Sequence, residues 1–349
     1  MFSTIFFISS GLFLGWSLGA NDAANLFGTA VGTKMVKFRT AAVIISIFVI
    51  VGAVISGAGA TNTLGALGTV NAMAGAFIVA LAAGISVFWM TKWGLPVSTS
   101  QAIVGAIIGW NIYAGYRTDP EILSKIISTW LFCPLLSALF AIIFFKIIKF
   151  IIDNYKIHLL RLDQYIRLGL IIAGAFGAYS LGANNIANVM GVFTGSFSIG
   201  RIDIGGIISI NSTQLLFLLG GIAISTGVIT YSKKVMSTVG KKIFKISPVA
   251  AFIVVLSSST VLFLFASAAL KTWLESHGLP SFPLVPVSSS QAVVGAVTGI
   301  GIAKGGRNIH FKTLGKIAVG WVITPITSAV ISYISLFFMQ NVFMQTVYF

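Results

Sequence analysis

Two short runs rich in polar side chains each occur twice in an otherwise apolar chain. GANDAANLFGTAVG at Gly19–Gly32 recurs as GANNIANVMGVFTG at Gly182–Gly195, with seven of 14 positions identical. PVSTSQAIVGAIIG at Pro96–Gly109 recurs as PVSSSQAVVGAVTG at Pro286–Gly299, with ten of 14 identical. Apolar composition explains repeated Gly, Ala and Val, but not Asn-x-x-x-Asn and Pro-Val-Ser-x-Ser-Gln appearing twice in the same order. We therefore interpret the chain as an internal duplication with one pair of polar motifs in each half.

The first motif offers oxygen ligands for a small, hard cation. Asn21 and Asn25 are four residues apart and share a helix face. Gly19 predicts the end of one helix, and Asn21 or Asp22 is a suitable N-cap for a new helix from Ala23. Asp22 is the one acid inside a predicted apolar segment, where an ionisable side chain marks an ion or proton pathway. The alternative is that these amides only bond neighbouring helices together. The residues predicted to bind Na⁺ are Asn21, Asp22, Asn25, Asn184, Asn185 and Asn188.

The second motif predicts an anion site at a helix start. Ser98 with Gln101, and Ser288 with Gln291, fit the Ser-x-x-Gln capping box. A helix N-terminus presents unpaired amides and the positive end of the helix dipole, and both favour an anion. The hydroxyl groups add donors that can surround a tetrahedral oxyanion. The residues predicted to line this site are Ser98, Thr99, Ser100, Gln101, Ser288, Ser289, Ser290 and Gln291.

The composition is that of an integral membrane protein. The chain has 349 residues, of which 57% are hydrophobic and only 8% charged, and its mean hydropathy is +1.00. A soluble domain has about a quarter charged residues. Cys133 is the one cysteine, which excludes an internal disulfide and a cysteine zinc site. The net charge of +15 comes from Lys and Arg between apolar runs, where these residues set membrane orientation rather than bind nucleic acid.

The apolar runs predict the fold. Spanning a bilayer takes about 20 apolar residues, and the predicted segments are 2–20, 40–57, 72–91, 97–115, 122–150, 166–183, 205–230, 248–272, 286–303 and 313–340. Five crossings in each half place the second half in the opposite orientation, as in inverted-repeat carriers. The predicted fold is an all-α polytopic membrane protein with two inverted-topology repeats, 1–160 and 161–349. Their broken or re-entrant helices are expected to meet at the membrane midplane.

Charge placement predicts the orientation. Met1–Asn21 has no basic n-region, so we expect it to be retained as the first span of a protein of the cell (inner) membrane. The positive-inside rule makes four basic clusters cytoplasmic: Lys34–Arg39, Lys146–Arg167, Lys233–Lys245 and Lys304–Lys316. Both termini and a charge-free loop at 58–71 are then expected outside the cell.

These duplicated motifs resemble those of the inorganic phosphate transporter family, the sodium- or proton-coupled phosphate permeases of the PiT type. The resemblance covers nearly the whole chain, and the family signature matches at Gly19–Asn25. It implies an inverted-repeat carrier, not an enzyme, that moves phosphate with cations and forms a homodimer in the bilayer. We expect Na⁺ to be the coupling ion and no other cofactor to be needed. Asp22 also joins the phosphate site, because it can accept a hydrogen bond from protonated phosphate. The chain departs from many family members at Asn185, which replaces Asp, and at Gln101 and Gln291, which replace His.

The sequence is also compatible with other functions. Proton coupling is one, because Asp22 can itself carry a proton, and sulfate is a second substrate because some relatives carry it. A passive anion channel is another class, but channels place like charges or a continuous filter along a pore, and neither motif contains Lys or Arg. An enzyme acting on a phosphate ester would need a nucleophile with a nearby base. His158, His277 and His310 lie in separate predicted loops, so that class is disfavoured.

Overall fold

Long apolar runs form the helices of the computed structural model, which describes residues 2–92, 97–155, 157–198, 200, 202–204, 208–238, 246–306 and 311–349. Pro96, the 239–245 part of the predicted cytoplasmic loop and Arg307 lie outside the described residues. The first half contains α1 (Phe2–Gly32), α2 (Phe38–Ser56), α3 (Ala58–Leu67), α4 (Met73–Lys92), α5 (Thr99–Ala114) and α6 (Pro120–Tyr155). The second half contains α7 (Leu159–Met190), η1 (Gly191–Phe193), β1 (Ile202–Ile204), β2 (Ile208–Ile210), α8 (Ser212–Thr230), α9 (Ser232–Thr238), α10 (Pro248–Leu264), α11 (Ala268–Ser276), α12 (Ser289–Ala303) and α13 (Phe311–Asn341).

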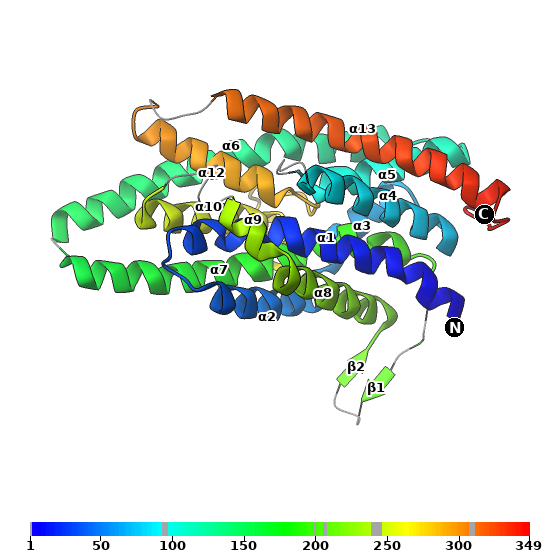
Figure 1. Ribbon diagram of the computed structural model, residues 1–349, viewed down its shortest axis with the longest axis horizontal. Coiled ribbons are helices and arrows are strands. Elements are labelled where there is room, and N and C mark those ends of the chain that lie inside the picture. Colours follow the sequence, from blue (N-terminus) through cyan, green and yellow to red (C-terminus); the bar gives the residue numbers. More distant parts are fainter. Residues whose placement is uncertain are drawn as a thin grey trace.

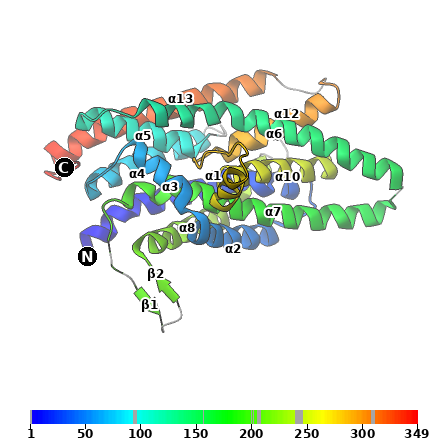
Figure 2. The ribbon, with the colours of Figure 1, turned by 180° about the vertical axis from the view of Figure 1, so that it is seen from behind.

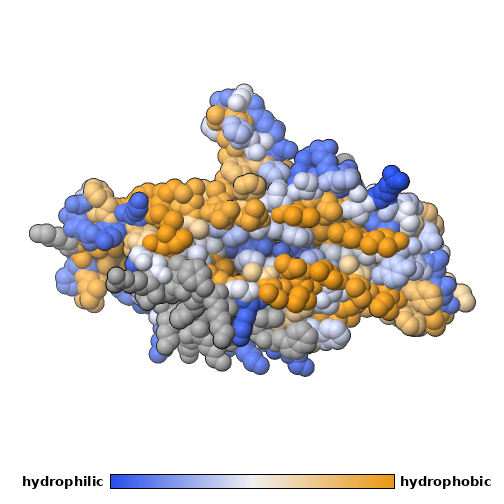
Figure 3. Space-filling view, turned by 90° about the horizontal axis from the view of Figure 1, so that it is seen from above, coloured by the Kyte–Doolittle hydropathy of each residue, from blue (hydrophilic) through white to orange (hydrophobic). Residues whose placement is uncertain are grey.

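The chain is an all-helical, multi-span membrane protein apart from the short antiparallel hairpin β1–β2, in which Ile202 pairs with Ile210. Within the described ranges, seven helices are long and apolar enough to cross a membrane. The pair α10–α11, bent by 67°, adds an eighth candidate span. Figure 3 shows hydrophobic residues over the middle of one long face and hydrophilic residues gathered towards its ends, as expected for a surface surrounded by lipid.

The helices pack in matched pairs drawn from the two halves. Helix α5 lies along α13, and α12 lies along α6 (Figures 1 and 2). Helix α1 packs on α4 and α8, and α7 packs on α10 and α2 in the same way. Each of these contacts made by a helix of the first half is therefore repeated by the equivalent helix of the second half. Helices α1 and α7 each pack against two neighbours in this arrangement.

Glycines allow two of these pairs to approach very closely. A Cβ atom at Gly105 of α5 would overlap the carbonyl of Pro325 in α13, and one at Gly295 of α12 would overlap the carbonyl of Pro134 in α6. The next turn repeats the contact, with Gly109 against Ala329 and Gly299 against Ala138. Both short helices thus carry a Gly-x-x-x-Gly face, which lets helix backbones meet in a membrane.

The first motif does not break its helix, so that prediction was wrong. Helix α1 continues through Gly19 and Asn21 to Gly32, and α7 continues through Gly182 to Met190. Gly19 serves a different purpose, because a Cβ there would overlap the carbonyl of Ile224 in α8. Gly182 has the same relationship with the carbonyl of Val49 in α2. These glycines permit close packing of continuous helices instead of ending them.

Three other segments differ from their predicted form. The predicted loop 58–71 contains helix α3, which follows α2 directly after Gly57. The predicted segment 205–230 is helical only from Ser212, because Asn211 and Gln214 form a reciprocal capping box there. The predicted segment 248–272 bends between α10 and α11. The predicted spans 72–91, 122–150 and 313–340 are confirmed as α4, α6 and α13 within a few residues. The predicted spans 97–115 and 286–303 are the helices α5 and α12, but at 16 and 15 residues they are shorter than the about 20 residues that cross a bilayer. The described helices therefore do not give the predicted five full crossings in each half.

Both termini lie at one end of the helix bundle, and the turn between α6 and α7 lies at the other (Figure 1). The C-terminal segment is held at this end by α5 and the chain before α4. The Asn71 side chain bonds both backbone groups of Phe349, at 3.0 and 3.1 Å. The Trp110 indole donates to the carbonyl of Val347 at 2.9 Å.

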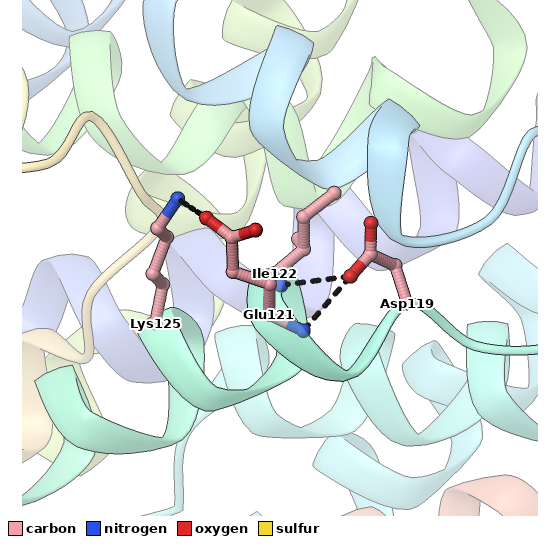
Figure 4. Close-up of polar contacts among 4 residues, drawn as sticks. All are labelled: Asp119, Glu121, Ile122 and Lys125. Atoms are coloured by element: carbon pink, nitrogen blue, oxygen red, sulfur yellow. Dashed lines mark hydrogen bonds and ion pairs between the residues drawn. The ribbon is translucent and has the colours of Figure 1, made fainter.

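Helix α6 begins at the same end with a polar cap. Asp119 accepts hydrogen bonds from the amides of Glu121 and Ile122, and Lys125 pairs with Glu121 one turn later (Figure 4). A carboxylate at a helix start satisfies free amides and complements the helix dipole. The three charged side chains are exposed, so they fix the end of the span rather than belong to a site.

Candidate functional site

The starts of α5 and α12 meet inside the protein and bond to one another reciprocally. The Ser100 hydroxyl donates to the carbonyl of Val287, at 3.1 Å, just before α12. The Ser290 hydroxyl donates to the carbonyl of Val97, at 2.9 Å, just before α5. Each helix start therefore supplies a donor to the extended segment that leads into the other. The predicted convergence of the two second motifs is present in the structure.

Each of these helix starts is capped by its own first serine. Ser98 Oγ accepts from the Gln101 amide at 3.2 Å, and Ser288 Oγ accepts from the Gln291 amide at 3.3 Å. A full capping box would also use the glutamine side chains. Instead, Oε1 of both Gln101 and Gln291 is buried and has no hydrogen-bond partner among the described residues. The backbone half of the predicted box is confirmed, and the glutamine carbonyl groups stay available.

Helix α1 brings Asp22, the one buried acid among the described side chains, to the start of α5. The Thr99 hydroxyl donates to Asp22 Oδ2 at 2.5 Å, while Asp22 Oδ1 is buried without a partner in the described chain. Ser289, at the start of α12, donates to the backbone carbonyl of Asp22 at 3.5 Å. Asp22 therefore touches both second motifs, and one carboxylate oxygen is left for a ligand.

The asparagines of α7 organise the second half of the site. Asn184 donates to the carbonyls of Phe265 and Val285, at 3.2 and 2.8 Å, and accepts from the Val287 amide at 2.7 Å. These bonds satisfy backbone groups freed where α10 ends and before α12 begins, as irregular backbone inside a membrane requires. Asn188 donates to Ser100 at 2.9 Å, which links α7 to the start of α5.

Asn185 occupies the position in α7 that corresponds to Asp22 in α1. Its Oδ1 accepts from Asn188 at 2.9 Å and is a second, more distant acceptor for the single Ser100 proton at 3.3 Å. Its Nδ2 has no partner among the described residues. A neutral amide with an unused donor thus replaces a carboxylate with an unused acceptor. The two halves of the site are alike in backbone but unlike in charge.

All fourteen predicted site residues are buried, with no more than 3% of any of them exposed. Asp22 is the one acid among them, and none is basic. Unpartnered buried atoms cluster at these positions: Asn21 Nδ2, Asp22 Oδ1, Asn25 Nδ2, Gln101 Oε1, Asn185 Nδ2, Asn188 Oδ1 and Gln291 Oε1. Leaving a buried polar group unpaired costs about 1–3 kcal/mol, so this concentration of free donors and acceptors fits a site that is completed by ligands. The unpartnered oxygens are acceptors of the kind that bind hard cations, and the unpartnered Nδ2 groups are donors of the kind that bind anions.

Sequence reasoning missed a contact between α6 and the start of α12, and a repeated run that contains it. The Cys133 thiol, fully buried in α6, donates to the carbonyl of Ser288 at 3.6 Å. TWLFCPLLSA at 129–138 recurs as GWVITPITSA at 320–329, with the same Trp, Pro, Ser and Ala. Comparing the halves beyond the two polar motifs would have revealed this third repeated run.

Comparison with known proteins shows which group shares this arrangement. The model of the phosphate transporter family matches residues 18–161, 156–332 and 279–348. A protein of Pyrococcus abyssi named "Putative phosphate permease" is 27% identical over 93% of this chain and 95% of its own. The sulfate permease CysP of Bacillus subtilis is 29% identical over 93% of this chain and 84% of its own.

A solved structure agrees with the family match. The structure titled "The sodium-dependent phosphate transporter" superimposes with a TM-score of 0.72 at 26% identity, covering 97% of this chain and 100% of that one. These likenesses extend over both halves and include all four polar motifs. The chain belongs to the phosphate transporter family and is a transporter rather than an enzyme.

Proposed function

We propose that this protein is a symporter that imports inorganic phosphate with Na⁺ by alternating access. The observation that carries the proposal is the buried meeting of two helix starts beside Asp22. Two helix N-termini supply free amides and positive dipole ends, and the surrounding hydroxyls supply further donors. This set of neutral donors suits a tetrahedral oxyanion. The proposed phosphate ligands are Ser98, Thr99, Ser100, Gln101, Ser288, Ser289, Ser290, Gln291 and Asp22.

Charge balance supports a cation as co-substrate. Phosphate brings one to two negative charges at neutral pH, while each helix dipole contributes only about half a positive charge. Asp22 adds a further negative charge when it is ionised, and no predicted site residue is basic. Desolvating such an anion without a counter-charge is strongly unfavourable. We therefore propose that Na⁺ binds first, at Asn21, Asp22, Asn25, Asn184, Asn185 and Asn188. The solved relative whose title says "sodium-dependent" supports this choice of ion.

The matched packing supports two inverted-topology repeats, residues 1–160 and 161–349. Swapping the two halves turns the pair α5–α13 into the pair α12–α6. It likewise turns the pair α1–α8 into the pair α7–α2. An inverted pair of this kind gives a site at the repeat interface, reached alternately from the two sides. We further propose that both termini face outside and that the protein forms a homodimer, as the family resemblance suggests.

The similarity to CysP keeps sulfate as a second candidate substrate. Asp22 Oδ1 favours phosphate, because this free acceptor can bind the proton of HPO₄²⁻ or H₂PO₄⁻. Sulfate carries no proton at neutral pH and would face the carboxylate directly. A proton bound by Asp22 would remove that repulsion. Sulfate transport by this site is therefore expected to be coupled to H⁺ rather than to Na⁺.

The test is uptake of labelled phosphate and labelled sulfate into proteoliposomes of the purified protein. An imposed Na⁺ gradient at fixed pH should drive phosphate uptake, and unlabelled phosphate inside should accelerate it by counterflow. Uptake without trans-stimulation would support a channel instead. Uptake that ignores Na⁺ but follows a proton gradient would contradict Na⁺ coupling, and sulfate uptake with no phosphate uptake would contradict the substrate assignment.

A further inference from the structure

Two tryptophans outside both polar motifs have buried N–H donors without an acceptor among the described residues. Trp130 lies in α6 and Trp321 lies in α13, at equivalent places in the repeated run described above. The Nε1 atom of each is buried, and no described residue accepts a hydrogen bond from it. An indole N–H can only donate. A buried donor left unpaired in both halves indicates an acceptor that arrives in another state of the protein.

The helix register places each tryptophan beside a site glutamine. Gly105 contacts Pro325 and Gly109 contacts Ala329, so α5 and α13 run parallel with a constant offset. One turn nearer the start of α5, the same offset pairs Gln101 with Trp321.

The other half repeats this relationship. Gly295 contacts Pro134 and Gly299 contacts Ala138, and one turn earlier Gln291 pairs with Trp130. The side-chain oxygen of each glutamine is a buried acceptor without a partner among the described residues. A free donor and a free acceptor are therefore neighbours by register in both halves.

A proline in α6 and another in α13 allow the helix to bend next to each tryptophan–glutamine pair. Pro134 and Pro325 lie four residues after their tryptophans, inside α6 and α13. A proline inside a helix cannot donate to the carbonyl four residues earlier, and such helices bend there. The backbone carbonyl of each tryptophan is thus released from its helix, and the ring sits at the point where the helix can bend.

We propose that Trp130 and Trp321 are positioning residues for the two site glutamines, an inference that rests on the proposed anion site. When the Gln101 amide nitrogen donates to a bound oxyanion, its carbonyl must turn away from that anion. The register places Trp321 beside this side chain, and the indole N–H of Trp321 then donates to the carbonyl. Trp130 does the same for Gln291. The indoles thereby hold both glutamines as donors to the anion, although neither ring touches it.

The experiment uses the full-length protein in Na⁺ buffer, with phosphate as the ligand. Trp321→Phe and Trp130→Phe keep an aromatic ring but remove the N–H group. Each should raise the phosphate KM about fivefold and leave kcat within twofold, since one neutral hydrogen bond is lost. Trp110→Phe is the matched control, because its indole bonds the C-terminal segment, and its KM should stay unchanged.

A double-mutant cycle tests the pairing itself. In a Gln101→Met background, Trp321→Phe should have no further effect on KM, because the acceptor is already absent. Independent, additive effects would overturn the positioning role. Equal KM values for both tryptophan variants and the wild type would overturn it as well.

A spectroscopic measurement on the wild type covers the case in which the variants do not fold. Ultraviolet resonance Raman spectra report hydrogen bonding at indole N–H, and added phosphate should shift that band for two of the seven tryptophans. An unchanged band with phosphate demonstrably bound would overturn the inference and leave the proposed function intact. Wild-type protein that binds no phosphate at all would overturn both.

Discussion

The Thr99 hydroxyl donates a 2.5 Å hydrogen bond to Asp22 Oδ2, which joins the start of α5 to the middle of α1. This bond leaves Oδ1 as the free oxygen of the buried carboxylate. The same contact therefore connects the proposed anion site to the proposed cation site. Its geometry explains how binding of one ion can alter the affinity for the other.

Removing this hydroxyl should weaken coupling without abolishing the fold. We expect Thr99→Val to lower the apparent Na⁺ affinity about tenfold, since a hydrogen bond to a charged group contributes about 1.5–3 kcal/mol. Thr99→Ser keeps the hydroxyl and should retain most of the affinity. Phosphate uptake measured against Na⁺ concentration distinguishes the two variants, and equal curves would contradict the role assigned to this bond.

Neutralising the buried acid should remove Na⁺-dependent transport. Asp22→Asn keeps the shape of the side chain but loses the charge that balances the cation, so uptake should fall to background while the purified protein stays folded. Asp163→Asn is the control, because Asp163 forms only an exposed pair with Arg167. Proteoliposome uptake and circular dichroism are the measurements, and full Na⁺-driven uptake by Asp22→Asn would exclude the coupling role.

The reciprocal serine bonds should contribute to both stability and binding. Ser100→Ala removes the donor to the carbonyl of Val287, and Ser290→Ala removes the donor to Val97. Each should cost about 1–3 kcal/mol by leaving a buried carbonyl unpaired. Ser9→Ala is the control, because Ser9 bonds only its own exposed helix turn. Thermal unfolding in detergent should show a lower midpoint for the first two variants alone.

A side chain placed at the contact between α5 and α13 should lower the stability of the protein. Gly105→Ala places a Cβ against the carbonyl of Pro325, and overpacking of this kind costs about 1–3 kcal/mol. Gly65→Ala in α3 has open space around the new methyl group and should be neutral or slightly stabilising. Comparing the two unfolding midpoints tests the contact, and equal midpoints would show that the helices can separate at little cost.

The proposed orientation can be tested with introduced cysteines. Arg117 and Asn154 are both exposed and lie at opposite ends of the bundle, before and near the end of α6. Arg117→Cys should react with an impermeant maleimide in intact cells, and Asn154→Cys should react only after permeabilisation. Cys133 is fully buried and gives little background. The reverse pattern of labelling would invert the orientation.

The sequence predicted the parts of this structure that depend on one segment at a time. Apolar length located α4, α6 and α13 within a few residues, and Ser-x-x-Gln located the helix starts at Ser98 and Ser288. Repetition of the motifs also indicated that these starts belong together, which the bonds between Ser100 and Val287 confirm.

Features that depend on a partner helix were misread or missed. Gly19 was interpreted as a helix end from its local conformational freedom, but its role is set by the carbonyl of Ile224, more than two hundred residues away. The 67° bend between α10 and α11 was missed for a related reason. Asn184 stabilises that break through Phe265, and hydropathy alone carries no information about such a pairing.

The crossed bonds of Ser100 and Ser290 also have a consequence for biogenesis. A serine hydroxyl of each half donates to a backbone carbonyl of the other half. A nascent chain that ends before α12 therefore lacks both of these hydrogen bonds. Translocon insertion can proceed helix by helix, but native tertiary structure around Asp22 has to wait until the start of α12 at Ser289, within the last fifth of the chain, has emerged from the ribosome. Pulse-labelled truncations ending before and after Gln291 should therefore differ sharply in protease resistance of the first half.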